Sequence, residues 1–243
     1  MPKQEKIWVW TLGVTVILLL IVVIVVRTYN VKQSQGVPKV IKHSKDGYDL
    51  YEIYNLLSSE ECDEIIAFAN TKGLYDSDVL SYGSSTGTTV MDEYRKSKTA
   101  WVADHEHDIA MKMAELSQNL TALPRENQEM LQVAYYEPGG KFNEHFDACV
   151  SEDTTGEFCK KMNNFAGQRR STLLVYLNDN FKGGETEFVN MGIKVKPEKG
   201  KGILFWNTDE NENILEMSKH KGNPVTKGEK WICTKWSHVS KYS

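Results

Sequence analysis

Hydrophobic residues are distributed unevenly along the chain, and they are densest near its beginning. Residues 7–26 read IWVWTLGVTVILLLIVVIVV, a run of twenty positions without a charged side chain. Because a helix rises about 1.5 Å per residue, this run covers about 30 Å, the hydrocarbon thickness of a bilayer. We therefore predict one transmembrane anchor at residues 7–26, preceded by a short tail of residues 1–6.

Two other structures could account for the same run: a cleaved signal peptide or a buried core helix. A signal peptide has an apolar stretch of roughly 7–15 residues followed by a small-residue cleavage site, and this run is longer and lacks such a site. Its length favours the anchor. Lys3 and Lys6 precede the run and Arg27 and Lys32 follow it, so the positive-inside rule leaves the orientation open.

The segment after the apolar run is expected to be a polar tether. Residues 27–45 are mostly polar and include Gly36 and Pro38. The folded domain is then predicted to span residues 46–243, which is long enough for one sizeable hydrophobic core.

The next pattern is the spacing of amphipathic helices. Ser58 and Glu61 are spaced as in a capping box, apolar residues follow at i, i+3, i+4 and i+7, and Gly73 is a natural stop. This pattern predicts a helix over residues 59–72. A second helix is predicted over residues 105–120, where apolar residues again share one face.

After Pro124 the pattern changes to short β-branched and aromatic runs separated by Gly, Pro, Asn and Asp. The runs are LQVAYY, STLLVYL, TEFVN, GILFW and WICTKWSHV. Several short strands at such spacing argue for an antiparallel barrel or a double-sheet jelly roll. The predicted order is therefore helices first, then a β core, which makes the fold class α+β.

Composition excludes some classes of function and leaves others open. The net charge of −4 carries no long block of one sign, so nothing indicates nucleic acid as a partner. Cys62, Cys149, Cys159 and Cys233 include no CxxC pair, which argues against a zinc module. Cys149 and Cys159 bracket nine residues and could close a short disulfide loop, which the sequence leaves undecided.

Candidate chemistry begins with His145 and Asp147 in GGKFNEHFDACV, two positions apart after a run with strand character. Side chains at i and i+2 of a strand point to one face, so both groups can converge on one point. His220 is the third candidate. Two histidines and one carboxylate are the ligand set of non-haem Fe(II) oxygenases. For an HxD pair taken alone, a surface pair without a ligand is the default explanation.

Lys230 is the second candidate for chemistry. It follows His220 by ten residues, after a Lys227-Gly228 turn that is expected to start a strand. A co-substrate carboxylate buried near the metal would need such a cation. The alternative is one more solvated lysine, which the spacing alone does not exclude.

Four motifs in this order resemble the prolyl 4-hydroxylase family, in its collagen-type, plant, algal and viral forms: LQVAYYEPGGKFNEHFD, RRSTLLVYLNDNFKGGETEF, VKPEKGKGILFWN and HKGNPVTKGEKWICTKWSHV. The likeness runs from Leu56 to His238. It implies a double-stranded β-helix (jelly-roll) core with the N-terminal helices packed on one sheet. It also implies 4-hydroxylation of peptidyl proline, coupled to oxidative decarboxylation of 2-oxoglutarate to succinate and CO2, with Fe(II), O2 and L-ascorbate.

The resemblance assigns roles to individual residues. It makes His145, Asp147 and His220 the iron ligands, and it makes Lys230 the residue that holds 2-oxoglutarate. Tyr136, Thr172 and Trp236 would line the co-substrate pocket, where the two hydroxyls could bond its carboxylate and the indole could close one wall. Without the resemblance, these three positions are more simply explained as strand and core residues.

Three further residues are candidates for substrate contact: Arg95, Phe142 and His238. Arg95 lies in RKSKTAW, which resembles the family's RxS-containing stretch near the peptide groove. Phe142 is a departure, because the family often has tyrosine there, so a substrate-contacting hydroxyl is missing.

The function predicted from these residues is hydroxylation of proline-rich or collagen-like peptides by an enzyme anchored in the endoplasmic reticulum or Golgi membrane, with a lumenal catalytic domain. The first rival is a lysyl or oxygen-sensing hydroxylase. Such relatives generally use arginine for the co-substrate, so Lys230 favours the collagen-type branch. The second rival is a non-catalytic, membrane-anchored β-barrel binding module. The sequence does not set the peptide preference or the oligomeric state.

Overall fold

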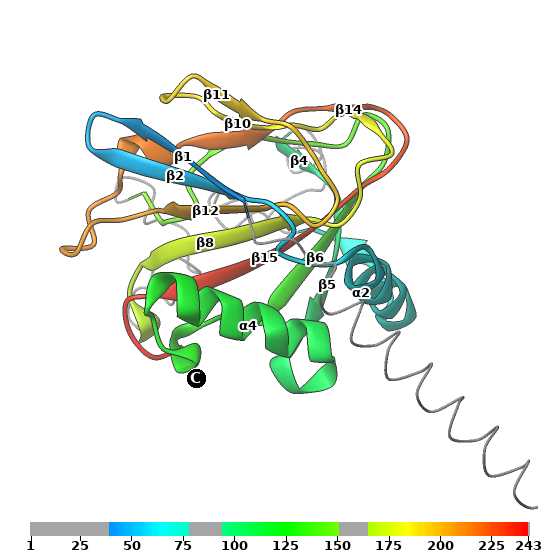
Figure 1. Ribbon diagram of the computed structural model, residues 1–243, viewed down its shortest axis with the longest axis horizontal. Coiled ribbons are helices and arrows are strands. Elements are labelled where there is room, and N and C mark those ends of the chain that lie inside the picture. The colour runs from blue at the N-terminus through cyan, green and yellow to red at the C-terminus, as the bar shows by residue number, and fades with distance from the viewer. Residues whose placement is uncertain (1–38, 78–93, 151–164, 243) are drawn as a thin grey trace, which may run out of the picture. The chain divides into compact units, whose positions relative to one another are not determined.

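The structure is a computed structural model that describes residues 39–77, 94–150 and 165–242 (Figure 1). The predicted anchor at residues 7–26 lies outside the described residues. Within them, no helix is long and apolar enough to cross a membrane.

Among the described residues, the larger of the two main sheets has eight strands, and every neighbouring pair in it is antiparallel. Its central strands are the β-branched and aromatic runs that the sequence pattern singled out. In sheet order the strands are β1 (Val40–Lys45), β2 (Tyr48–Ile53), β12 (Gly202–Trp206), β8 (Arg169–Tyr176), β15 (Lys230–His238), β6 (Leu131–Tyr136), β5 (Lys98–Val102) and β3 (Tyr75–Asp76).

The smaller sheet has five strands, and a two-stranded ribbon accompanies it. An apolar cluster joins the two main sheets: Phe188 of the smaller sheet packs edge-on against Phe205 of the larger, with ring centroids 5.0 Å apart. Two sheets that share such a core make the predicted jelly roll. The smaller sheet runs β11 (Ile193–Val195), β10 (Thr186–Phe188), β13 (His220–Gly222), β7 (Lys141–His145) and β4 (Arg95–Lys96), and the ribbon is β14 (Val225–Lys227) with β9 (Lys182–Gly183).

In the described part of the chain, two helices cover the other face of the larger sheet: α2 (Ser59–Lys72) on β5 and β6, and α4 (Asp108–Thr121) on β6 and β15 (Figure 1). The first confirms its prediction, including the capping box: the backbone N–H of Glu61 donates to the Ser58 hydroxyl, and that of Ser58 to the Glu61 carboxylate. The second starts later than predicted, because a 3-10 turn (Asp104–Glu106) precedes it and His107 caps it.

The predicted tether at residues 27–45 needs a correction, because its last part is strand β1. β1 and β2 form a hairpin whose two-residue turn is Asp46-Gly47, with φ of 49° and 81°. Positive φ at both positions is the signature of a type I′ turn, and Asp-Gly is its preferred sequence. The folded unit therefore begins at Lys39 rather than at residue 46.

The cysteines divide into two kinds. Cys62 and Cys233 are free and buried in the core beneath the helices. Cys149 is disulfide-bonded. Its predicted partner, Cys159, lies outside the described residues, so the pairing itself stays a prediction.

Candidate active site

Two adjacent strands of the smaller sheet bring the candidate ligands together. His145 is the last residue of β7, His220 is the first of β13, and the two face each other in the antiparallel register. Their ring centroids are 4.3 Å apart. Asp147 lies two residues beyond the end of β7, where the chain turns its carboxylate back toward both rings.

The ligand atoms of these three residues form one compact face. The Asp147 oxygens lie 3.7 Å from His145 Nε2 and 3.9 Å from His220 Nε2, and one ligand atom from each residue lies within 4.8 Å of the others. The Nδ1 atoms lie 2.7 Å and 2.9 Å from backbone carbonyl oxygens. Since a carbonyl only accepts, each Nδ1 donates, and each neutral ring keeps the Nε2 lone pair for a metal.

Burial and neighbouring charges shift the pKa values of His145 and Asp147 in the direction that favours binding of a cation. Burial, together with the neighbouring His220, holds the pKa of His145 well below its usual value. Burial by itself would raise the pKa of Asp147, but His220, His145 and Arg169 outweigh it and lower that pKa. An ionised carboxylate beside a neutral imidazole is the state that divalent iron requires of its ligands.

Thr172 holds the carboxylate of Asp147 in place. Its hydroxyl donates to Asp147 Oδ2 at 2.7 Å and accepts from Asn207 Nδ2 at 2.8 Å. With its one proton given to Asp147, the hydroxyl helps to orient this metal ligand. Thr172 also lines the pocket described next, as predicted, and a bond from its hydroxyl to the co-substrate stays a prediction.

A pocket opens beside the ligand face, between the two sheets. Most of the residues named from the sequence line it, so the structure brings together segments that are far apart in the chain. The lining residues are Arg95, Gln132, Tyr136, Phe142, His145, Asp147, Thr172, Leu174, Thr186, His220, Gly222, Lys230, Ile232, Thr234 and Trp236.

Lys230 is the cation of this pocket. It starts β15 opposite Tyr136 of β6, and its side chain is 2% exposed. Within the described part of the chain its ammonium has no hydrogen bond or ion pair; it faces the rings of Tyr136 and Tyr176 at 5.1 Å and 5.6 Å. Burial lowers its pKa to about 7, against a weaker opposing effect of Glu185.

Two glycines shape the space around Lys230. A Cβ at Gly184, whose φ is 68°, would lie 3.0 Å from Lys230 Cδ and still closer to a ring carbon of Phe181. A Cβ at Gly222 would lie 3.9 Å from Lys230 Nζ, which places the ammonium beside β13, two residues from His220. The pocket thus holds a buried, unpaired ammonium close to the ligand face, and this arrangement fits a dicarboxylate that chelates a metal with one end.

Sequence reasoning missed a buried charge cluster behind the ligands, formed by Glu129 and Arg169. The guanidinium of Arg169 forms a bidentate ion pair with the Glu129 carboxylate. It also donates to the backbone oxygen of Asp147 at 3.4 Å and lies 3.9 Å from the ring centroid of Trp236. The first arginine of RRST, Arg169, was the signal in the sequence that could have indicated this cluster. Trp236 lines the pocket as predicted.

His238 belongs to this cluster, which corrects its expected role as a substrate contact. It is 1% exposed and does not line the pocket. Its Nε2 lies 2.9 Å from Glu129 Oε1, and its Nδ1 lies 2.9 Å from the backbone oxygen of Gly167. A side chain with both ring nitrogens engaged in the interior has no atom left for a substrate.

The other two substrate candidates do line the pocket. Phe142 stacks on His145, with ring centroids 3.5 Å apart, and the guanidinium of Arg95 lies 4.7 Å from the centre of the same ring. Arg95 also donates to Gln132 Oε1 at 3.0 Å. Their contact with a substrate stays a prediction.

Comparison with known proteins agrees with this geometry. The family model described as "2OG-Fe(II) oxygenase superfamily" matches residues 131–238, which include all three ligands and Lys230. The fold and the site thus define a 2-oxoglutarate- and Fe(II)-dependent oxygenase, with O2 as the second co-substrate.

Similar proteins define the kind of oxygenase more narrowly. A putative prolyl 4-hydroxylase of Acanthamoeba polyphaga mimivirus is 35% identical over 79% of this chain and 75% of its own length. A probable prolyl 4-hydroxylase of Arabidopsis thaliana is 33% identical over 76% of this chain and 67% of its own. The structure of a viral collagen prolyl hydroxylase from Paramecium bursaria Chlorella virus 1, in complex with 2OG, covers 78% of this chain and 95% of its own, with 29% identity and a TM-score of 0.62. The chain belongs to the prolyl 4-hydroxylase family.

Proposed function

We propose that this protein hydroxylates proline residues of a peptide at C4, with the coupled conversion of 2-oxoglutarate and O2 to succinate and CO2. The observation that carries the proposal is the union of the His145–Asp147–His220 face with the unpaired, buried ammonium of Lys230 in one pocket. The relatives support the same reaction, since those from the mimivirus and Arabidopsis are named as prolyl 4-hydroxylases.

The residues of the site have separate roles in the proposed reaction. His145, Asp147 and His220 would hold Fe(II) on one face and leave its other positions open for 2-oxoglutarate and O2. Bound iron supplies the oxygen-activating chemistry. Lys230 would pair with the distal carboxylate of 2-oxoglutarate, and the buried walls would keep water away from the reacting atoms. Phe142 and Arg95 would border the position of the proline ring.

The proposed substrates are proline-rich or collagen-like peptides. Lys230 supports them over lysyl or oxygen-sensing substrates, as the family resemblance implies. A solved relative carries the name viral collagen prolyl hydroxylase, which is why collagen-like peptides belong in the panel of tests.

The test is turnover with Fe(II), 2-oxoglutarate, ascorbate and a panel of peptides. Collagen-like repeats and Ser-Pro repeats should gain one oxygen atom at proline by mass spectrometry, and succinate should form in equal amount. The matched controls are the same peptides with alanine for proline, and the Asp147→Ala variant. Succinate release without any oxidised proline, or full turnover by Asp147→Ala, would contradict the proposal.

We further propose that residues 7–26 anchor the enzyme in the endoplasmic reticulum or Golgi membrane, with the catalytic domain in the lumen. The twenty-residue apolar run supports the anchor, and the disulfide-bonded Cys149 supports an oxidising compartment. The full chain should stay in the membrane pellet after alkaline extraction, and its catalytic domain should resist added protease until the membrane is opened. Release by alkali would refute the anchor.

A further inference from the structure

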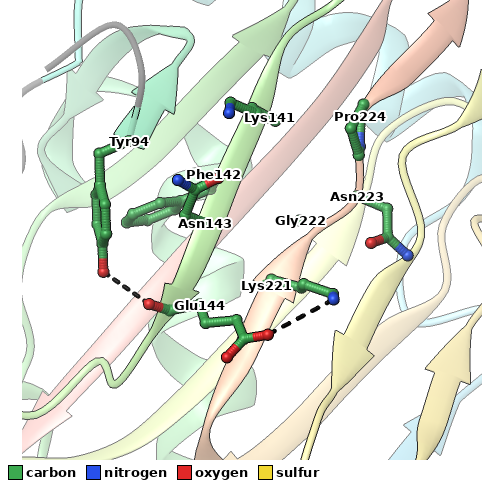
Figure 2. Close-up of a pocket in the computed structure, with 9 residues that line it drawn as sticks. All are labelled: Tyr94, Lys141, Phe142, Asn143, Glu144, Lys221, Gly222, Asn223 and Pro224. Atoms are coloured by element: carbon green, nitrogen blue, oxygen red, sulfur yellow. Dashed lines mark hydrogen bonds and ion pairs between the residues drawn. The ribbon is translucent and has the colours of Figure 1, made fainter. Parts of the chain in front are cut away.

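A second groove follows strands β7 and β13 next to the active-site pocket, with a cavity volume of about 540 Å³ (Figure 2). Phe142 and Gly222 line both hollows, so the groove adjoins the pocket at the ring that stacks on His145. A peptide that places a proline beside Phe142 must continue past that ring. The groove is a surface that can receive the continuing chain.

The charges at one end of the groove are neutralised within the protein. Lys221 Nζ lies 3.7 Å from a carboxylate oxygen of Glu144 and 3.7 Å from one of Glu187. Figure 2 shows the first of these pairs, together with the Tyr94 hydroxyl donating to the backbone oxygen of Glu144 at 2.7 Å. This end therefore offers little net charge to a ligand.

The other end carries positive charge that the rest of the described chain does not balance. Lys141 lines the groove, and Lys96 of β4 faces it directly in the β4–β7 register. No carboxylate among the described residues forms an ion pair with either ammonium. Like charges directly opposite each other destabilise a sheet, so an anion between or beside them would remove a cost already present. We call these residues the Lys96–Lys141 pair.

We propose that the groove binds the peptide segment that flanks the target proline, and that the Lys96–Lys141 pair selects substrates with an acidic residue in that segment. The inference rests on the proposed peptide-hydroxylase function and adds to it a preference that the ligand face and Lys230 do not determine. Continuity with the pocket argues for a flanking part of the substrate, and the two unbalanced lysines argue for an acidic one.

The test uses one peptide sequence with a central proline and Glu, Gln or Lys at flanking positions, placed either before or after the proline. For wild type, KM for the Glu peptide on one side should be about three- to fivefold below that for the Gln peptide, the scale of a single partly solvated ion pair. The Lys peptide should have the highest KM, and kcat should hardly change. The difference should shrink as salt screens the charges.

Variants at Lys96 and Lys141 test whether the Lys96–Lys141 pair causes the preference for an acidic residue. Lys96→Gln with Lys141→Gln should equalise the Glu and Gln peptides, and Lys141→Glu should favour the Lys peptide. Lys241→Gln, at an exposed lysine outside the groove, is the matched control and should keep the wild-type preference.

Two results would overturn the inference: equal KM values for all three peptides with wild type, or a preference that survives in the double variant. Turnover of the uncharged Gln peptide tests the proposed reaction separately. If no peptide is hydroxylated, fluorescence anisotropy of the labelled peptides without O2 still measures the groove. In that measurement, equal binding of the Glu and Gln peptides would contradict the charge preference, whatever the outcome for the proposed reaction.

Discussion

At the scale of residues, the site depends on which polar atoms already have partners inside the protein. The Nδ1 atoms of His145 and His220 are occupied by backbone carbonyls, and the proton of Thr172 is given to Asp147. The ammonium of Lys230 has no such partner in the described structure, although it is buried. The occupied groups orient the metal ligands, and the unoccupied one is left for the co-substrate.

Removal of this ammonium should weaken 2-oxoglutarate binding far more than peptide binding. A buried charge left without its partner costs about 3–5 kcal/mol, which is two to four decades in affinity. Lys230→Ala should raise KM for 2-oxoglutarate accordingly while it still binds Fe(II). Lys230→Arg should recover little, because a planar fork does not fit a space shaped for an ammonium. Titration of 2-oxoglutarate against the three proteins measures this, and near-wild-type KM values for both variants would show that Lys230 does not hold the co-substrate.

The same lysine predicts a pH dependence of co-substrate binding. Burial lowers its pKa to about 7 in the folded protein, below the ordinary 10.5, so the empty pocket holds mostly the neutral amine above pH 7. The carboxylate pairs with the charged form, so binding at pH 8 should take up a proton, and affinity should fall as pH rises above about 7. Calorimetry in buffers of different ionisation enthalpy measures the uptake. Lys230→Met should abolish it; the same uptake in that variant would assign it to another group.

At the scale of elements, the helices and strands follow local signals, and their ends follow local hydrogen bonds. Helix α2 begins where its capping box places it, and the central strands of the larger sheet coincide with the apolar runs. The strands before residue 103 were not predicted, and β1 and β2 are the clearest omission, because Asp46-Gly47 between them is a strong hairpin signal. Residues 40–45 are mostly polar and exposed because β1 is an edge strand, so its pattern resembles that of a tether.

The capping box of α2 allows a measurement of one local signal. Ser58→Ala removes the acceptor for the backbone N–H of Glu61 and should lower the free energy of unfolding by about 1 kcal/mol. Ser58→Asp keeps an acceptor and should stay close to wild type. Urea unfolding of the three proteins provides the comparison; equal midpoints would mean that packing alone holds the start of the helix.

At the scale of the whole molecule, the two sheets and the edge hairpin form a single folded unit. β1 pairs along its full length with β2, and His43 and Lys201 both bind the carboxylate of Glu52, each at 2.8 Å. The start of the folded unit at Lys39 therefore bears on the stability of the entire domain.

Three shortened chains test this boundary. A chain of residues 39–243 should unfold at the same urea concentration as a chain of residues 27–243. A chain of residues 46–243 lacks β1 and leaves Glu52 without His43, so its midpoint should be clearly lower. Equal midpoints for all three would show that β1 adds no stability to the domain.

The sequence by itself determined helix α2, the central strands of the larger sheet and the identity of the three candidate metal ligands and Lys230. A helix or strand depends on neighbours within a few positions, and the motifs around His145, His220 and Lys230 are contiguous in the chain. Only the tertiary structure decided which polar atoms remain free. In the folded protein the hydroxyl of Thr172 donates to Asp147, His238 is buried against Glu129, and Lys230 has no polar partner among the described residues. These contacts join segments more than twenty residues apart in the chain, and the sequence pattern does not specify how such segments meet.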